Sequence, residues 1–383
     1  MSSRIKIPRK TKQAKIRSKA KQPKPAEVVV SLDELLIQIL LRLPAKSVMR
    51  FKLVSKHWKY LITSPHFALQ HNRNPSPAVG LFYESSELVY IHLNARRPRT
   101  PAIPPIRELF FPGETDQYCI GQSCNGLLVC CSYGSNHNQL RGSTSVVGKC
   151  YIYNPTTKQF TTIPHLNKGK VRGINLAYDR AKSPPYKLVA VRDSEDSKLH
   201  KQIEIYSSES GEWRVSVHWM NDYYSDLWYF NVDQERLGVI RRLDRCKKGQ
   251  VLYFGESCDH LHLIERYDND STLYVYEMKR DHSEWLFKHQ VDISIVASKY
   301  HGITFDNDEP RNGYGFSVFS FVRGKEVEED SFLILQAELK VIRFNLGRKT
   351  FKVIFDLEGT PVSHMSSFSG KLAFEYIESL ACV

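Results

Sequence analysis

The hydrophobic periodicity of this 383-residue chain changes once, near residue 79, and that change divides the chain into two unequal parts. Between residues 31 and 63, apolar residues recur every three or four positions, which is the spacing of amphipathic helices. After residue 79, they form short β-rich runs separated by Gly, Pro, Asn, Asp and Ser, as in antiparallel hairpins. We therefore expect a multidomain α+β protein, with a small helical module followed by a large all-β domain.

The helical module is predicted to contain three short helices. One apolar stripe runs from Leu32 to Leu43 and ends at Pro44, which cannot continue a helix. Ser31 and Glu34 form a capping box at its start. Two more apolar sets predict two further helices that end before residue 65. Because a core of fewer than about 40 residues seldom holds together alone, we expect a partner to cover part of this apolar surface.

The second part of the chain contains many short β-rich runs. They are residues 79–83, 88–92, 127–131, 150–153, 187–191, 203–206, 251–254, 261–264, 273–276, 315–321, 332–336 and 340–344. So many short strands in one region favour a β-propeller, with a β-sandwich as the alternative.

A loose internal repeat also favours a propeller, because propellers repeat one blade. In each copy an aromatic residue closes one run, and a second aromatic residue opens the next run across a polar turn. The pairs are Tyr153 with Phe160, Tyr206 with Trp213, Tyr276 with Trp285, and Phe344 with Phe351. Their first members lie 53, 70 and 68 residues apart, so the period is imperfect. Ordinary hairpins with cross-strand aromatic pairs are the alternative explanation.

The helical module resembles an F-box, and we assign residues 28–72 to it. The resemblance rests on Ile39-Leu40, Leu43-Pro44, Val54-Ser55-Lys56, Trp58 and Leu61-Ile62, which follow the family's order and spacing. The family's usual opening Leu-Pro is replaced by Ser31-Leu32, which alters the first cap.

The β domain, assigned to residues 73–383, resembles the kelch- and propeller-like F-box-associated domain of plant F-box proteins. The matching stretches are residues 123–128 (SCNGLL), 153–157 (YNPTT) and 203–214, which end in EWR. The region around residues 218–248 matches the pattern poorly, so the number of blades stays open.

Together these resemblances imply the substrate-recognition adaptor of an SCF-type (Skp–cullin–F-box) E3 ubiquitin ligase. The F-box would bind a Skp-family adaptor, which links it to a cullin and a RING subunit, and the β domain would bind an unknown target protein. Such a chain is not an enzyme and needs no cofactor, because its partners carry out the ubiquitin chemistry. Residues expected to contact the adaptor, or to hold the helices together, are Leu35, Leu36, Ile39, Leu40, Leu43, Pro44, Val48, Phe51, Val54, Trp58, Leu61 and Ile62.

The net charge of +13 comes from the N-terminal part of the chain. Residues 1–25 contain ten Lys and Arg and no acidic residue, whereas residues 73–383 contain 38 basic and 38 acidic residues. We expect residues 1–27 to be a disordered basic tail, serving as a nuclear-import signal or a solubilising arm. A nuclear regulator that contacts nucleic acid through this tail is an alternative function, which the neutral large domain disfavours.

Other features of the sequence indicate the cellular compartment in which the protein works. No apolar run reaches the roughly 18 residues of a membrane-spanning helix, and no apolar segment follows the basic start as in a secretory signal. The eight cysteines form no C-x-x-C pair, which favours reduced thiols. We expect the protein in the nucleus, the cytoplasm or both, with no membrane partner.

Two stretches are candidate sites of chemistry. Cys258, His260 and His262 alternate, so on one strand they would share a face and could form a weak zinc site, the basis of a less favoured metal-dependent enzyme. Residues 121–126 resemble a nucleophile elbow, but the second glycine comes one residue late and a strand follows, so we expect a hairpin there.

An aromatic cluster at residues 222–230 is the candidate for target binding. On a loop at a propeller face, Tyr223, Tyr224, Trp228 and Tyr229 would form a protein-recognition patch. Buried in a strand pair, the same residues would be core, which is the more common location of Trp and Phe.

Overall fold

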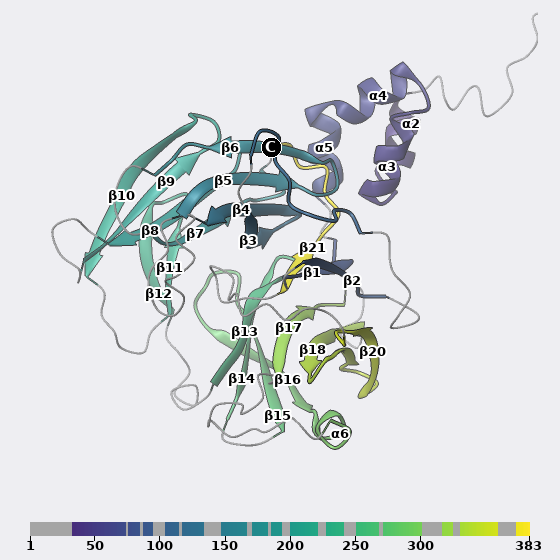
Figure 1. Ribbon diagram of the computed structural model, residues 1–383, viewed down its shortest axis with the longest axis vertical. Coiled ribbons are helices and arrows are strands. Elements are labelled where there is room, and N and C mark those ends of the chain that lie inside the picture. The colour runs from purple at the N-terminus through teal and green to yellow at the C-terminus, as the bar shows by residue number, and fades with distance from the viewer. Residues whose placement is uncertain are drawn as a thin grey trace, which may run out of the picture. The chain divides into compact units, whose positions relative to one another are not determined.

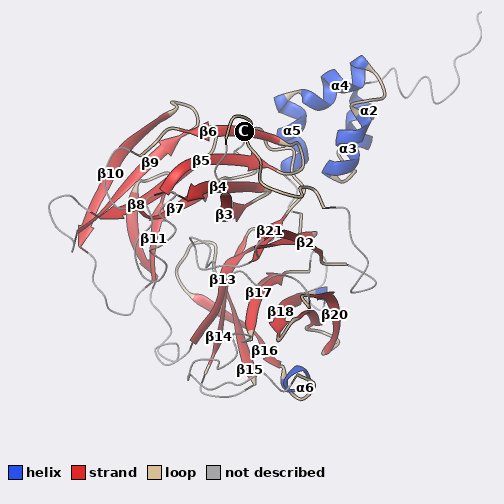
Figure 2. Ribbon diagram, in the orientation of Figure 1, coloured by secondary structure: helices blue, strands red, loops and turns tan. Residues whose placement is uncertain are grey.

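The computed structural model describes residues 33–73, 76–84, 87–94, 104–114, 117–133, 147–166, 171–182, 185–193, 200–220, 227–240, 250–267, 271–300, 316–324, 330–358 and 373–383. Within these ranges four helices precede the first strand, and the strands form six sheets (Figures 1 and 2). The expected order of a small helical module and a large all-β domain is confirmed. The expected basic tail, residues 1–27, lies outside the described residues.

The helical module consists of α2 (Asp33–Leu40), α3 (Ala45–Phe51), α4 (Lys56–Thr63) and α5 (Pro65–Asn72). Serine side chains cap α4 and α5, because Ser55 Oγ accepts from the Trp58 N–H and Ser64 Oγ from the Phe67 N–H. The last helix was not predicted: Pro65 begins α5, at a position where a helix needs no N–H donor. By compactness, the chain up to Arg42, with α2, is one unit, and the chain from Leu43 onward is a second.

The β domain is a five-bladed β-propeller, which confirms the expected architecture. Four blades each have four antiparallel strands in chain order. They are β3 (Tyr118–Cys124), β4 (Leu127–Tyr133), β5 (Val147–Asn154) and β6 (Gln159–Ile163); β7 (Val171–Ala177), β8 (Lys187–Asp193), β9 (His200–Ser207) and β10 (Glu212–Met220); β13 (Gln250–Ser257), β14 (His260–Arg266), β15 (Thr272–Met278) and β16 (Trp285–Asp292); and β17 (Ser317–Val322), β18 (Phe332–Ala337), β19 (Lys340–Asn345) and β20 (Thr350–Asp356). A short helix, α6 (Ser294–Ala297), follows β16.

The fifth blade joins strands from the two ends of the domain. Its central strand β1 (Gly80–Glu84) pairs with β2 (Leu88–His92) on one side and with β21 (Ala373–Tyr376) on the other. In this register Phe82 lies opposite both Tyr90 and Phe374, so three aromatic residues cross the sheet in one row. The blade therefore closes the propeller with a strand made almost 290 residues after its neighbour.

The innermost strands of neighbouring blades lie next to one another in the order β13, β17, β21, β3, β7. Four of them contain a β-bulge, and polar side chains near the bulges connect adjacent blades. Gln122 Oε1 accepts from the Leu176 N–H, and both Tyr253 and Ser320 donate to the Glu375 carboxylate. Most of the remaining contact between blades is apolar, in clusters shared by adjacent sheets.

A two-stranded hairpin, β11 (Leu227–Asn231) and β12 (Arg236–Ile240), packs against two blades at once. Phe230 contacts Ile203 and Ile205 of the β7–β10 blade, and Ile240 contacts Leu263 of the β13–β16 blade. This hairpin occupies the region that matched the family pattern poorly.

Three of the four predicted aromatic pairs are cross-strand neighbours, each joining the third and fourth strands of a blade. The fourth pairing is wrong, because a bulge beside Tyr276 shifts the register and places Phe287 opposite it, while Trp285 faces Met278. The expectation of reduced cysteines is wrong for Cys131 and Cys150, which face each other on β4 and β5 and form a disulfide. None of the helices in the described ranges has the length and apolar character to cross a membrane.

Candidate functional site

The helical module exposes apolar side chains that a free-standing protein would normally bury. Among the described residues, its exposed large apolar side chains are Leu35, Ile39, Leu53, Val54 and Tyr60, which we call the exposed apolar set. Leu53 is 90% exposed and Tyr60 is 77% exposed, so both extend almost fully into solvent. Contiguous exposed apolar surface is typical of docking sites for other proteins, so these five side chains are candidates for partner contact.

The twelve residues predicted for adaptor contact divide according to burial. Leu36, Leu40, Val48, Leu61 and Ile62 are buried; Leu43, Phe51 and Trp58 are half-buried; and Leu35, Ile39, Pro44 and Val54 are exposed. The buried residues are those expected to hold the helices in shape. Adaptor contact by the others stays a prediction.

The connection between α3 and α4 presents two members of the exposed apolar set, Leu53 and Val54. The rings of Phe51 and Trp58, on either side of this connection, lie 5.5 Å apart at an angle of 53° and pack together. Leu53 and Tyr60 were missed because they fall outside the helical stripes. Two adjacent apolar residues in a short connection between polar neighbours were the available signal for Leu53.

The C-terminal segment, residues 376–381, ties helices α3 and α5 to the β3–β6 blade. The Glu378 carboxylate accepts from the Lys46 N–H in the first turn of α3 at 3.0 Å. The Asn72 side chain at the end of α5 accepts from the Leu380 N–H at 3.1 Å. From the blade, the Asn154 amide donates to the Ala381 carbonyl at 2.8 Å.

The two sequence motifs of the first blade form turns that receive this segment. In YNPTT, Asn154 Oδ1 accepts from the Thr156 and Thr157 N–H groups, which closes the β5–β6 turn. In SCNGLL, Asn125 and Gly126 form the β3–β4 turn with positive φ, and a Cβ built on Gly126 would lie 2.4 Å from the Ser379 Cβ. The hairpin predicted in place of a nucleophile elbow is confirmed.

Cys258, His260 and His262 do not share one strand face. Cys258 and Asp259, both with positive φ, form the turn between β13 and β14, so the chain reverses before His260. This turn is the physical reason why the predicted alternation fails at Cys258. Within the described ranges, no group of three His, Cys, Asp or Glu residues is arranged to hold a metal ion.

Both histidines instead surround Glu277 of β15. His260 Nδ1 and His262 Nε2 each lie 3.3 Å from a Glu277 carboxylate oxygen, and Arg323 Nε lies 3.1 Å from it. Burial lowers the pKa of His262 to about 4, and the nearby Glu277 offsets this effect only in part. His262 also packs on the Phe321 ring at 4.5 Å between centroids, so it is a neutral core histidine.

The aromatic cluster is only partly within the described residues. Tyr223 and Tyr224 lie outside them, and Trp228 is in β11 without a described side chain. Tyr229 is half-buried and packs against Gly238 of β12 and the His282 ring. Target binding by these residues stays a prediction.

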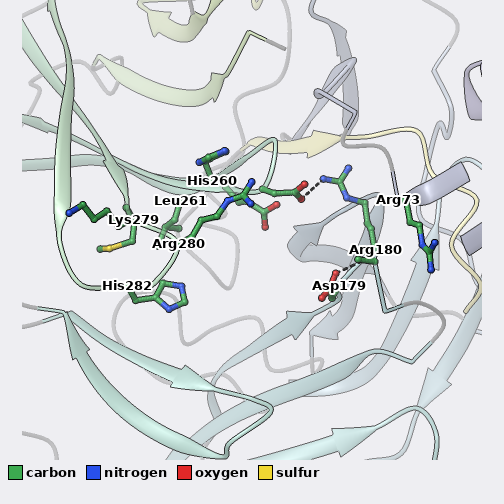
Figure 3. Close-up of a pocket in the computed structure, with 12 residues that line it drawn as sticks. Arg73, Asp179, Arg180, His260, Leu261, Lys279, Arg280 and His282 are labelled. Atoms are coloured by element: carbon green, nitrogen blue, oxygen red, sulfur yellow. Dashed lines mark hydrogen bonds and ion pairs between the residues drawn. The ribbon is translucent and has the colours of Figure 1, made fainter. Parts of the chain in front are cut away.

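A pocket of about 570 Å³ opens between the β7–β10 and β13–β16 blades, and we call it the charged pocket (Figure 3). It is lined by residues 179–181 of the β7–β8 turn, by 256 and 259–261 around the β13–β14 turn, by 278–280 and 282 around the β15–β16 turn, and by Arg73 after α5. Sequence patterns do not reveal this pocket, because its residues come from four separate segments. The one sequence feature that these segments share is charged residues in turns, and surface turns in general have that feature.

Comparison with known protein families identifies both parts of the chain. A family described as F-box domain matches residues 33–70, and one described as F-box associated beta propeller domain matches residues 80–239. The chain is 30% identical over 406 residues to F-box protein At5g07610 of Arabidopsis thaliana, with 94% of each chain covered. It is 25% identical over 290 residues to putative F-box protein At4g09190 of the same plant, covering 67% of this chain and 70% of that one.

The helical module and the propeller define a two-part recognition protein of the plant type. This chain belongs to the F-box proteins that carry an F-box associated β-propeller domain. Its relatives are named as F-box proteins, a class of adaptors rather than enzymes.

Proposed function

We propose that this chain is the substrate-recognition subunit of an SCF-type ubiquitin ligase. Its F-box helices bind a Skp-family adaptor, which connects it to a cullin and a RING subunit, and its propeller binds a target protein. The observation that carries the proposal is the exposed apolar set, with Leu53 90% exposed on a module of the F-box family. Covering these side chains with an apolar partner surface removes them from water and stabilises the complex.

The chain contributes to ubiquitin transfer by proximity. A target bound to the propeller and a ligase bound to the F-box share one chain, which raises the effective concentration of target lysines near the charged enzyme. The hydrogen bonds that Glu378 and Asn72 accept and that Asn154 donates support this role, because they restrict movement of α3 and α5 relative to the propeller.

Adaptor binding is tested by co-purification of a Skp-family adaptor with the full chain and its variants. Leu53→Asp places a charge on an exposed position without disturbing a core, whereas the buried Leu40 is unsuitable because its substitution would unfold the module. Ile295→Asp is the matched control, since Ile295 is an exposed apolar residue of α6 in the propeller. We expect the wild type and Ile295→Asp to retain the adaptor and Leu53→Asp to lose it. Failure of the folded wild type to retain any adaptor would refute the proposal.

We also propose that the protein works in the nucleus, the cytoplasm or both, with the basic tail acting in import. The support is the ten basic residues of residues 1–25. A fluorescent fusion of the full chain is compared with one that lacks residues 1–27. A loss of nuclear signal on deletion supports import, and an unchanged distribution contradicts it.

A further inference from the structure

The charged pocket contains no member of the exposed apolar set, and its acidic and basic side chains are unevenly paired. We propose that it binds a short acidic segment of the target protein, with Arg280 and Arg73 pairing with the acidic side chains. This inference rests on the proposed function, which makes the propeller's ligand a protein.

Each carboxylate that lines the charged pocket already has a partner. Asp259 forms an ion pair with Arg180 at 2.8 Å, and Arg180 is itself buried. The Glu256 carboxylate accepts a hydrogen bond from the Asp259 N–H at the same turn. Asp179 Oδ1 accepts from the Ala181 N–H at 2.8 Å. Each of these acids therefore already accepts at least one hydrogen bond from within the pocket lining.

The cations of the lining are less completely paired. Lys279 forms an ion pair with Glu284, outside the pocket. Within the described part of the chain, the guanidinium groups of Arg73 and Arg280 form no ion pair or hydrogen bond, and both side chains are exposed. Figure 3 shows Arg280 reaching in from the β15–β16 turn, with Arg73 on the opposite side. Guanidinium groups bind carboxylates and phosphates through paired, charge-assisted hydrogen bonds, so the pocket favours an anion.

The remaining lining favours a polypeptide over a bare ion. Leu261 and Met278 add apolar surface beside the two arginines, and the His282 ring is held in place by Tyr229. The volume of about 570 Å³ lies within the roughly 300–1,000 Å³ of ligand pockets and exceeds what one carboxylate requires. An acidic side chain with an apolar neighbour matches both parts of this lining.

The turns of the charged pocket lie at one end of their blades. In a four-stranded antiparallel blade the first and third turns share an end, and the β7–β8, β13–β14 and β15–β16 turns are all of these kinds. The β3–β4 and β5–β6 turns, which receive the C-terminal segment, belong to the same end of their blade. A segment bound in the pocket would therefore lie on the propeller face that receives the C-terminal segment and, through it, α3 and α5.

The test uses the full chain and immobilised heptapeptide pools whose central residue is Asp or Glu, with Asn or Gln pools as the uncharged control. We expect the wild type to retain the acidic pools about tenfold more strongly, as one charge-assisted contact would give. Arg280→Glu should remove the preference, and the milder Arg280→Gln should reduce it. Arg348→Glu is the matched control, because Arg348 is an exposed arginine in a third turn of another blade. Thermal unfolding confirms that every variant is folded.

Equal retention of acidic and uncharged pools by the wild type would overturn the proposal, as would a preference that survives both Arg280→Glu and Arg73→Glu. Titration with inorganic phosphate distinguishes a peptide ligand from a free anion. If the wild type binds phosphate but retains no peptide, and Arg280→Glu loses phosphate binding, the proposal of a peptide ligand is overturned. Adaptor capture is measured on the same samples. If Arg280→Glu still captures the adaptor but has lost the preference for acidic peptides, the result supports peptide binding in the charged pocket. If the wild type fails to capture the adaptor, that result refutes only the proposed function.

Discussion

The side-chain amide of Asn154 donates a 2.8 Å hydrogen bond to the carbonyl of Ala381, 227 residues later in the chain, and both residues are completely buried. The same amide donates to the Ser379 carbonyl at 3.2 Å, while its oxygen accepts from the N–H groups that close the β5–β6 turn. One asparagine thus shapes a turn and holds the C-terminal segment.

Replacing Asn154 with Ala should lower the free energy of unfolding by about 2–4 kcal/mol, because several buried backbone groups lose their partner. Asn345→Ala is the control, since Asn345 Oδ1 accepts from the Arg348 N–H in the equivalent turn of another blade. Within the described ranges, the Asn345 side chain forms no hydrogen bond with the C-terminal segment. This control substitution should cost about 1 kcal/mol or less. Urea denaturation measures both, and equal losses would contradict a special role for Asn154.

Gly126→Ala should destabilise the protein more than Gly211→Ala. Both glycines have positive φ, so alanine is strained at both, by about 1 kcal/mol. Only at Gly126 does the new Cβ meet protein atoms, with Ser379 Cβ at 2.4 Å and the Ile377 carbonyl at 2.8 Å, whereas nothing lies within 4 Å at Gly211. Thermal unfolding of the two variants should differ, and similar melting temperatures would show that the segment moves aside easily.

Stability should decline as pH rises toward neutrality because of Glu84. Burial raises the pKa of Glu84 from 4.5 to about 7, and a hydrogen bond from the Ile120 N–H opposes this only in part. A carboxyl group with a raised folded pKa contributes stability that is fully present below pH 4.5 and is lost as pH rises through 7. Glu84→Gln can still accept the hydrogen bond from Ile120. Its gain in the free energy of unfolding over the wild type should therefore be larger at pH 8 than at pH 4.5, by about 1–3 kcal/mol. Urea denaturation at both pH values checks this, and a pH-independent effect would contradict it.

Adjacent residues of α2 should separate stability from binding. Leu36 is 2% exposed and Leu35 is 47% exposed. Leu36→Ala should lower stability by about 2–4 kcal/mol, whereas Leu35→Ala should cost less than about 1 kcal/mol and weaken adaptor binding. Chemical denaturation and adaptor titration are measured on both, and the assignment fails if Leu35→Ala leaves the adaptor affinity unchanged.

The sequence was sufficient to predict the architecture because every blade contains at least two strands with a clear β-rich pattern. Each of the twelve β-rich runs overlaps a strand, and ten of them lie entirely within one, including the run in the fully buried β18. The missed strands have weaker patterns for physical reasons. The innermost strands β3 and β7 contain Gly121 and Gly173 at bulges, which interrupt the alternation of apolar residues. The outer strand β6 is largely exposed and so lacks an apolar face.

The irregular repeat also has a structural explanation. The interval of 70 residues between Tyr206 and Tyr276 contains the β11–β12 hairpin, which separates two blades in sequence while packing on both. Sequence spacing could not place the charged pocket either, because Arg73 and Arg280 are more than 200 residues apart in the chain and line one pocket only in the folded protein.

The pairing of β1 with β21 also sets the order of events during protein synthesis. Residues 80–84 emerge early from the ribosome, but their partner at residues 373–376 is made last among the strands. The F-box helices can therefore form while the ring of blades is still open. The contacts of residues 376–381 with α3 and α5 arise only once the last strand has been made. A nascent chain of this protein would need protection from aggregation for most of its translation, and any truncated product would carry an F-box on a ring that never closes.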